Sequence, residues 1–169
     1  MSKKVLVVLS EWGYWGEELV GPLEALDANG YETVFMTSKG KRAHALPPSM
    51  EPGYFDPPLK KVVTDEYYAQ RTREIDQSTR LDNPINLQEW FPERPYFNDA
   101  NFGHALEAYY NEREKKWEEL KQYDALLMVG GSGPLIDMVN NQRLHDVILG
   151  FVALDKLVVA ECYAVTCLA

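Results

Sequence analysis

The amino-acid sequence predicts an α/β domain in which a doubly wound parallel sheet carries helices on both faces. Residues 4–37 show a strand, helix and strand pattern, and a crossover of that length joins parallel strands. The same alternation resumes at residue 123 and runs to residue 161. The 169 residues are expected to form one domain, because they are enough for one hydrophobic core and contain no internal repeat.

The first strand, helix and strand are assigned from their apolar patterns. Residues 4–10 form a continuous apolar run, which predicts a buried strand, and a loop rich in glycine and tryptophan follows. Residues 17–29 carry apolar side chains at helical spacing, and Gly30 stands where such a helix would end. Residues 31–37 then alternate as a second strand.

Residues 40–122 break this rhythm with clustered prolines and many aromatic side chains. Disordered linkers are poor in aromatics, so the segment is expected to be ordered, as a few short helices over one end of the sheet. Residues 104–121 have one apolar and one charged face, which predicts a helix. Two interpretations of the insertion stay open: a packed subdomain that covers the core, or a lid over an active site.

The C-terminal part returns to short, regular elements. Residues 123–129 are predicted to be a strand, followed by a tight Gly-Gly-Ser-Gly-Pro turn. Helices are expected at 134–140 and 142–154, and a strand at 157–161 leads into Cys162.

Composition excludes several classes of function. The formal net charge of −9 argues against a nucleic-acid backbone or an anionic membrane surface as partner. No apolar run approaches the ~20 residues that cross a bilayer. Two cysteines five residues apart form neither a disulfide framework nor a metal site, so we expect no metal, no cofactor and a reducing, cytoplasmic location.

Cys162 is the leading candidate for reactive chemistry. It stands where a buried strand stops abruptly and small or aliphatic residues begin, the pattern of a sharp strand-to-helix turn. A helix N-terminus favours negative charge and would lower the pKa of a thiol placed there. The alternative is an inert core cysteine, because free cysteine packs as a small hydrophobe. Cys167 is expected to be inert on the packed side of the elbow helix.

Other strand ends bring further groups to the same edge of the sheet. The Gly130-Gly131 turn can expose backbone N–H groups that hold a developing oxyanion. It lacks the lysine and the spacing of a phosphate-binding loop. Glu17 suits the start of the first helix, whereas the helical phase turns Glu18 toward the strand ends and the thiol. An ionised Glu18 would raise the pKa of the thiol, and a protonated one would donate a hydrogen bond to the thiolate.

Four segments together resemble the DJ-1/PfpI superfamily of class I glutamine-amidotransferase-like folds, most closely its Hsp31-like branch. Residues 13–26 are similar to the family's first loop and helix, and residues 29–41 to its second strand and turn. Residues 129–138 are similar to its Gly-Gly turn and residues 160–165 to its nucleophile elbow. The resemblance implies a flavodoxin-like sheet with a helical lid insertion.

The resemblance also implies a set of site residues. Cys162 would be the nucleophile, Glu18 the active-site glutamate, and Gly131 and Tyr163 the donors of oxyanion amides, while Trp15 and Ser132 would line the substrate pocket. Tyr163 stands where many family members have histidine, which removes the adjacent base. Ser132 likewise replaces a histidine of the Gly-Gly turn.

The implied activity is that of a hydrolase or lyase with a cysteine nucleophile and a small electrophilic substrate, such as a carbonyl or an amide. Two alternatives stay open: a redox sensor that oxidises Cys162, and a chaperone-like protein that uses the aromatic insertion. Family members continue beyond the elbow helix, and a seven-residue helix is marginal alone. A second polypeptide or C-terminal fragment is therefore expected to complete the sheet, within a homo- or hetero-oligomer.

Overall fold

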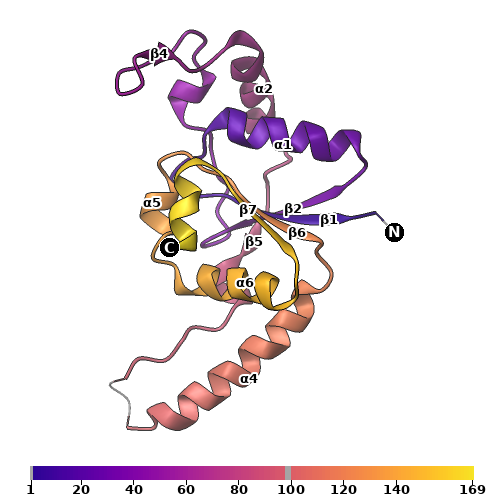
Figure 1. Cartoon of the computed structure of the whole chain (residues 1–169), viewed down its shortest axis with the longest axis vertical. Coiled ribbons are helices and arrows are strands. Elements are labelled where there is room, and N and C mark those ends of the chain that lie inside the picture. Colours follow the sequence, from indigo (N-terminus) through magenta and orange to yellow (C-terminus); the bar gives the residue numbers. More distant parts are fainter. Residues whose placement is uncertain (1, 98–99) are drawn as a thin grey trace.

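A computed structural model describes residues 2–97 and 100–169 and contains the predicted parallel sheet (Figure 1). The order of its strands is β5-β2-β1-β6-β7, and each neighbouring pair is parallel. The strands are β1 (Lys4–Val8), β2 (Glu32–Thr37), β5 (Ile85–Asn86), β6 (Ala125–Met128) and β7 (Leu157–Ala160). Four of them match predicted strands, and the short edge strand β5 comes from within the 40–122 insertion.

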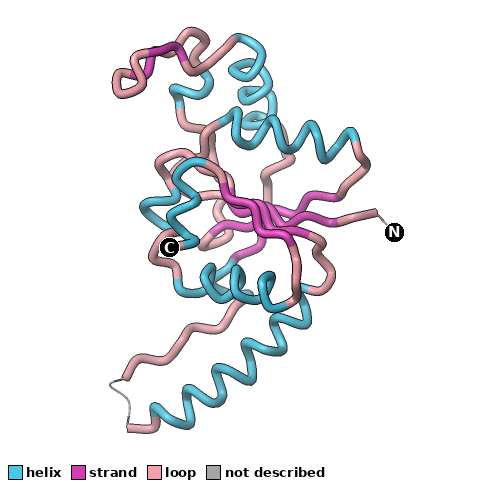
Figure 2. Tube along the Cα trace, viewed as in Figure 1, coloured by secondary structure: helices cyan, strands magenta, loops and turns pink. Residues whose placement is uncertain are grey.

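Alternate side chains of the central strand enter two separate cores. Val5 and Val7 of β1 pack into one core, and Leu6 and Val8 pack into the other, as the two-residue period of a strand requires. Helices cover both faces of the sheet, which is the arrangement expected for a doubly wound fold (Figures 1 and 2). The helices are α1 (Gly16–Ala28), α2 (Glu66–Gln77), α3 (Leu87–Trp90), α4 (Phe102–Leu120), α5 (Pro134–Asp137) and α6 (Gln142–Ala153), with 3-10 helices η1 (Pro47–Met50) and η2 (Cys162–Leu168).

The 40–122 insertion differs from the predicted cover over one end of the sheet. Its first half contains η1, a hairpin of β3 (Phe55–Asp56) and β4 (Lys61–Val62), and α2. That half packs on the α1 face, where Ile75 joins the core of Val5 and Val7. Its second half ends in α4 on the opposite face, where Leu120 joins the other core. β5 lies within the insertion and pairs with β2. The helix before it, α2, therefore packs on one face of the sheet, and the helix after it, α4, packs on the other.

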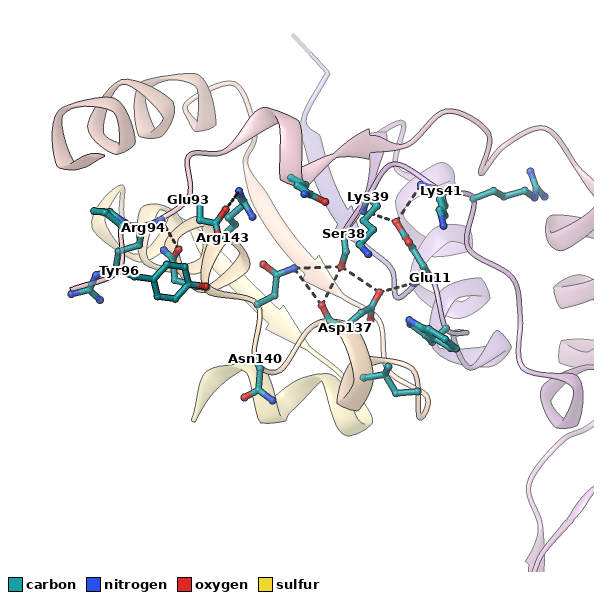
Figure 3. Close-up of a pocket in the computed structure, with 17 residues that line it drawn as sticks. Glu11, Ser38, Lys39, Lys41, Glu93, Arg94, Tyr96, Asp137, Asn140 and Arg143 are labelled. Carbon is teal, nitrogen blue, oxygen red and sulfur yellow. Dashed lines mark hydrogen bonds and ion pairs between the residues drawn. The ribbon is translucent and has the colours of Figure 1, made fainter. Parts of the chain in front are cut away.

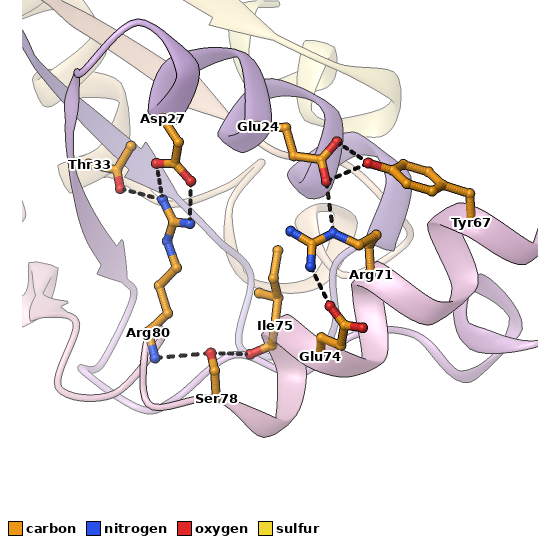
Figure 4. Close-up of polar contacts among 9 residues, drawn as sticks. All are labelled: Glu24, Asp27, Thr33, Tyr67, Arg71, Glu74, Ile75, Ser78 and Arg80. Carbon is orange, nitrogen blue, oxygen red and sulfur yellow. Dashed lines mark hydrogen bonds and ion pairs between the residues drawn. The ribbon is translucent and has the colours of Figure 1, made fainter.

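Close packing joins α1 to α2. A Cβ atom at Gly16 would clash with the side chain of Thr72, so only glycine allows the two helices to approach this closely. Figure 4 shows the polar contacts at their outer edge, where Arg71 pairs with Glu24 and Arg80 pairs with Asp27. These pairs are solvent-exposed and add little stability compared with the packing.

A buried carboxylate joins α4 to α6. Asp146 accepts hydrogen bonds from the Tyr109 hydroxyl and the Gln142 amide, and Arg113 lies 3.5 Å away. Burial and the neighbouring carboxylate raise the pKa of Tyr109, so its hydroxyl remains a proton donor. The network holds α4 against α6. Among the described residues, no helix is long and apolar enough to span a membrane.

Candidate active site

A sharp turn at the end of β7 presents Cys162. The Glu161 N–H still donates to Met128 of β6, at 3.1 Å, and keeps the strand paired up to the turn. Cys162 then adopts φ 49°, in the left-handed region that non-glycine residues rarely occupy, and η2 begins there. Such conformations cost about 1–2 kcal/mol and concentrate at functional sites. The thiol-bearing residue is exposed, whereas Cys167 is buried in the α6 core.

Glu18 lies beside this thiol. It stands in the first turn of α1, half-buried, and its carboxyl lies next to the Cys162 side chain, because both flank the position that a Cβ atom of Gly130 would take. Its Oε2 atom is shielded from solvent and has no hydrogen-bond partner among residues 2–97 and 100–169. Glu17 is exposed, as its place at the start of the helix suggested. The structure therefore brings Glu18, and not Glu17, to the thiol.

The Gly130-Gly131 turn packs against the side chains of Cys162 and Glu18. A Cβ atom at Gly130 would lie 2.6 Å from the Cβ of Cys162 and would overlap Glu18 Oε2, so glycine is required between these two side chains. The Gly130 carbonyl accepts from the Trp15 N–H at 3.1 Å, and Gly131 has φ 93°. The backbone N–H groups of Gly131 and Tyr163 both interact with the Cys162 thiol.

The two predicted pocket residues lie at the margin of this site. Trp15 is half-buried, and its ring packs against Tyr54, with centroids 6.4 Å apart. Ser132 is exposed, and its carbonyl caps the start of α5 by accepting from the Leu135 N–H at 3.3 Å. The phenol of Tyr163 points outward and is about half exposed, so Tyr163 contributes its backbone, not its side chain, to the thiol.

A family model described as "ThiJ/PfpI family-like" matches residues 9–169. The chain belongs to this family. No curated protein matches it. Among solved structures, it resembles the Rapid Encystment Protein 24 kDa of Francisella tularensis, with 19% identity and a TM-score of 0.55 over 98% of this chain and 61% of that one.

Two further structures share the fold of this ThiJ/PfpI-like chain. A ThiJ/PfpI domain protein from Brachyspira murdochii is 13% identical, with a TM-score of 0.54 over 98% of this chain and 62% of that one. The glyoxalase III of Candida albicans is 19% identical, with the same TM-score over 98% and 59% of the two chains. The chain thus spans about three fifths of the length of these proteins. The resemblance to the Hsp31-like branch stays a prediction.

The electrostatics of the site correct one sequence-based expectation. The pKa of the Cys162 thiol is raised, not lowered, because burial and then the negative charge of Glu18 outweigh the backbone donors of Gly131 and Tyr163. Burial also raises the pKa of the Glu18 carboxyl, and the nearby Glu161 adds to this effect. The pKa values of carboxyl and thiol are therefore both raised: Glu18 disfavours the thiolate, whereas the hydrogen bond from Cys162 partly offsets the effect of burial on Glu18.

Sequence reasoning did not single out Glu161. This half-buried carboxyl has a raised pKa, from burial and from the charge of Glu17, and it acts electrostatically on Glu18. Its position in the sequence, directly before the cysteine at the strand end, could have indicated that it lies near the site. Glu161 thus adds a second carboxyl close to Glu18, and its negative charge favours the protonated form of Glu18.

Replacing Glu18 by glutamine is expected to lower the pKa of Cys162, because the substitution removes a nearby negative charge and keeps the shape. The pH dependence of iodoacetamide alkylation measures this shift. The same variant should gain stability relative to the unmodified protein as pH rises. A buried carboxyl with a raised pKa favours the folded state while protonated, and this contribution is lost above its folded pKa.

Glu17→Gln is the matched control for this experiment. It removes the same charge from the neighbouring exposed position and should move the alkylation midpoint much less. Equal shifts in the two variants would show that Glu18 has no special relation to the thiol.

Proposed function

We propose that Cys162 is the nucleophile of an enzyme that acts on a small electrophilic substrate, a carbonyl, an amide or a related carbon. One observation carries the proposal: an exposed cysteine in a left-handed conformation, with a half-buried carboxyl and two backbone N–H groups near its thiol. Each part matches a requirement of nucleophilic catalysis, namely access, proton transfer and stabilisation of negative charge.

In the proposed reaction, the Cys162 thiol gives its proton to Glu18. The unpartnered Oε2 atom of Glu18 is available to accept this proton, and the raised pKa of the carboxyl makes its ionised form a stronger base. The sulfur forms a bond to the electrophilic carbon as the carbonyl π electrons move to oxygen. The Gly131 and Tyr163 N–H groups would then donate to that oxyanion, and Glu18 would return the proton to the oxygen or the leaving group.

Turnover of dicarbonyl and small-amide substrates by the unmodified protein and by Cys162→Ala tests the proposal. Turnover that requires Cys162 supports it. Turnover that persists without Cys162 would overturn it, as would an inactive protein in which peroxide readily converts Cys162 to a sulfinate, since that pair of results identifies a redox sensor.

We also propose that a second polypeptide or C-terminal fragment covers the β7 side of the sheet. The outer edge of β7 pairs with no strand among the described residues. Large apolar side chains are exposed on α6, β7 and η2 on this side, namely Leu149, Val152, Leu157, Val165 and Leu168. An open sheet edge beside exposed apolar residues favours association with another polypeptide.

The purified 169-residue chain is accordingly expected to associate with itself when no partner is present. Light scattering coupled to gel filtration measures its mass, and Val152→Lys with Leu157→Lys should shift it toward the monomer. Leu59→Lys with Val62→Lys is the matched control, because these exposed residues lie on the β3-β4 hairpin. A monomeric, cooperatively unfolding protein would contradict this proposal.

A further inference from the structure

A cavity of about 810 Å³ opens at the carboxyl ends of β1, β2 and β5 (Figure 3). Its walls come from the segments after these strands, from residues 93–96 and from residues 136–143 at the end of α5 and the start of α6. None of the residues at the Cys162 site lines it. The position and the volume are both typical of small-molecule sites in open α/β folds.

The acidic side chains of this cavity are occupied by hydrogen bonds from the protein. One Glu11 oxygen accepts the N–H groups of Lys39 and Lys41, at 2.5 and 3.2 Å. Asp137 accepts from the Ser10 hydroxyl at 2.6 Å and from the Glu11 N–H at 3.0 Å. Glu93 pairs with Arg143 at 3.0 Å. These carboxylates therefore hold the cavity wall together.

Three cationic side chains of the same cavity have no such partner. Among the residues that the structure describes, the ammonium groups of Lys39 and Lys41 and the guanidinium of Arg94 make no hydrogen bond or ion pair. The cavity thus keeps free positive charge in a chain whose formal net charge is −9. The first residues of α6 also line it, and the N-terminus of this twelve-residue helix attracts anions.

Neutral groups complete the lining. The side-chain amides of Gln88 and Asn140 have no protein partner among the described residues and can bond hydroxyl groups. Exposed rings of Trp12 and Tyr96 give apolar surface at the cavity's margin. Free cations, a helix N-terminus and amides suit a ligand that carries both phosphate and hydroxyl groups.

We infer that this cavity binds a phosphorylated, hydroxyl-bearing small molecule. Lys39 and Lys41 hold the phosphate, and the amides hold the hydroxyls. The inference does not depend on the chemistry of Cys162.

Calorimetric titration of the protein as purified, with any partner polypeptide retained, tests the inference. The probes are ribose 5-phosphate, inorganic phosphate, ribose and citrate. Ribose 5-phosphate should bind most tightly, inorganic phosphate more weakly, and ribose not at all. Lys39→Gln with Lys41→Gln should weaken ribose 5-phosphate binding about tenfold or more, because each hydrogen bond to a charged group contributes about 1.5–3 kcal/mol.

Lys60→Gln with Lys61→Gln is the matched control, since it removes two exposed lysines of the β3-β4 hairpin outside the cavity. This control should change the dissociation constant of ribose 5-phosphate by no more than about twofold relative to the unmodified protein. If both double substitutions weakened ribose 5-phosphate binding equally, the loss would come from the change in net charge alone, and the inference would be overturned. Absence of ribose 5-phosphate binding, or citrate binding at least as tightly, would overturn it as well. Thermal melting of each variant verifies folding, which these exposed substitutions should preserve.

Discussion

Replacing Cys162 by alanine is expected to abolish thiol reactivity of the folded protein and to lower the proposed turnover about 10³-fold or more. Cys162 is exposed at the elbow, whereas Cys167 is only 4% exposed and packs in the core beneath α6. Under native conditions, iodoacetamide should therefore modify Cys162 alone. Intact-mass and peptide mass spectrometry measure both the extent and the position of labelling.

Cys167→Ala is the control for that experiment. It should leave labelling of Cys162 and turnover unchanged, and it should cost about 1 kcal/mol of stability because a buried sulfur is removed from a packed core. Preferential labelling of Cys167 in the unmodified protein would contradict the assignment of the reactive thiol.

The fold was predictable where a single element carries its own pattern. The apolar run of β1, the helical spacing in α1 and the strand before Cys162 all specify their structure locally, and each lies within a few residues of its predicted bounds. β5 has only two residues and follows Asn83 and Pro84, which indicate a loop. It is a strand because Met36 and Thr37 of β2 pair with it, a long-range contact that no local pattern encodes.

The site was predictable to the extent that parallel topology determines it. Carboxyl ends of neighbouring strands meet at one edge, and so the elbow, the glycine turn and Glu18 could be expected to converge. The direction of the Cys162 pKa shift could not be predicted, because it depends on how desolvation of the thiol and the charge of Glu18 balance against the backbone donors. The cavity was missed for a similar reason: Lys39 and Arg94 come to line one cavity only after β5 has joined β2.

Gly130→Ala is expected to disrupt both the site and the fold around it. The new Cβ atom would overlap Glu18 Oε2 and would lie 2.5 Å from the Glu161 carbonyl and 2.6 Å from the Cβ of Cys162. The side chains can move apart, but the Glu161 carbonyl is backbone at the end of β7, so the strand end itself must shift. Such overpacking costs about 1–3 kcal/mol. Urea unfolding measures this loss, and the rate of Cys162 alkylation reports the displaced thiol.

Gly103→Ala provides the matched comparison, because Gly103 lies in α4 and, apart from its own helix backbone and chain neighbours, no described heavy atom lies within 4 Å of its would-be Cβ. There, alanine should be neutral or should stabilise the helix by about 0.5–1 kcal/mol, with no change in alkylation. If Gly130→Ala behaved in the same way, Gly130 would not be the spacer between thiol and carboxyl. The contrast between the two glycines therefore tests whether the chain places Cys162 and Glu18 in contact by leaving out a single side chain.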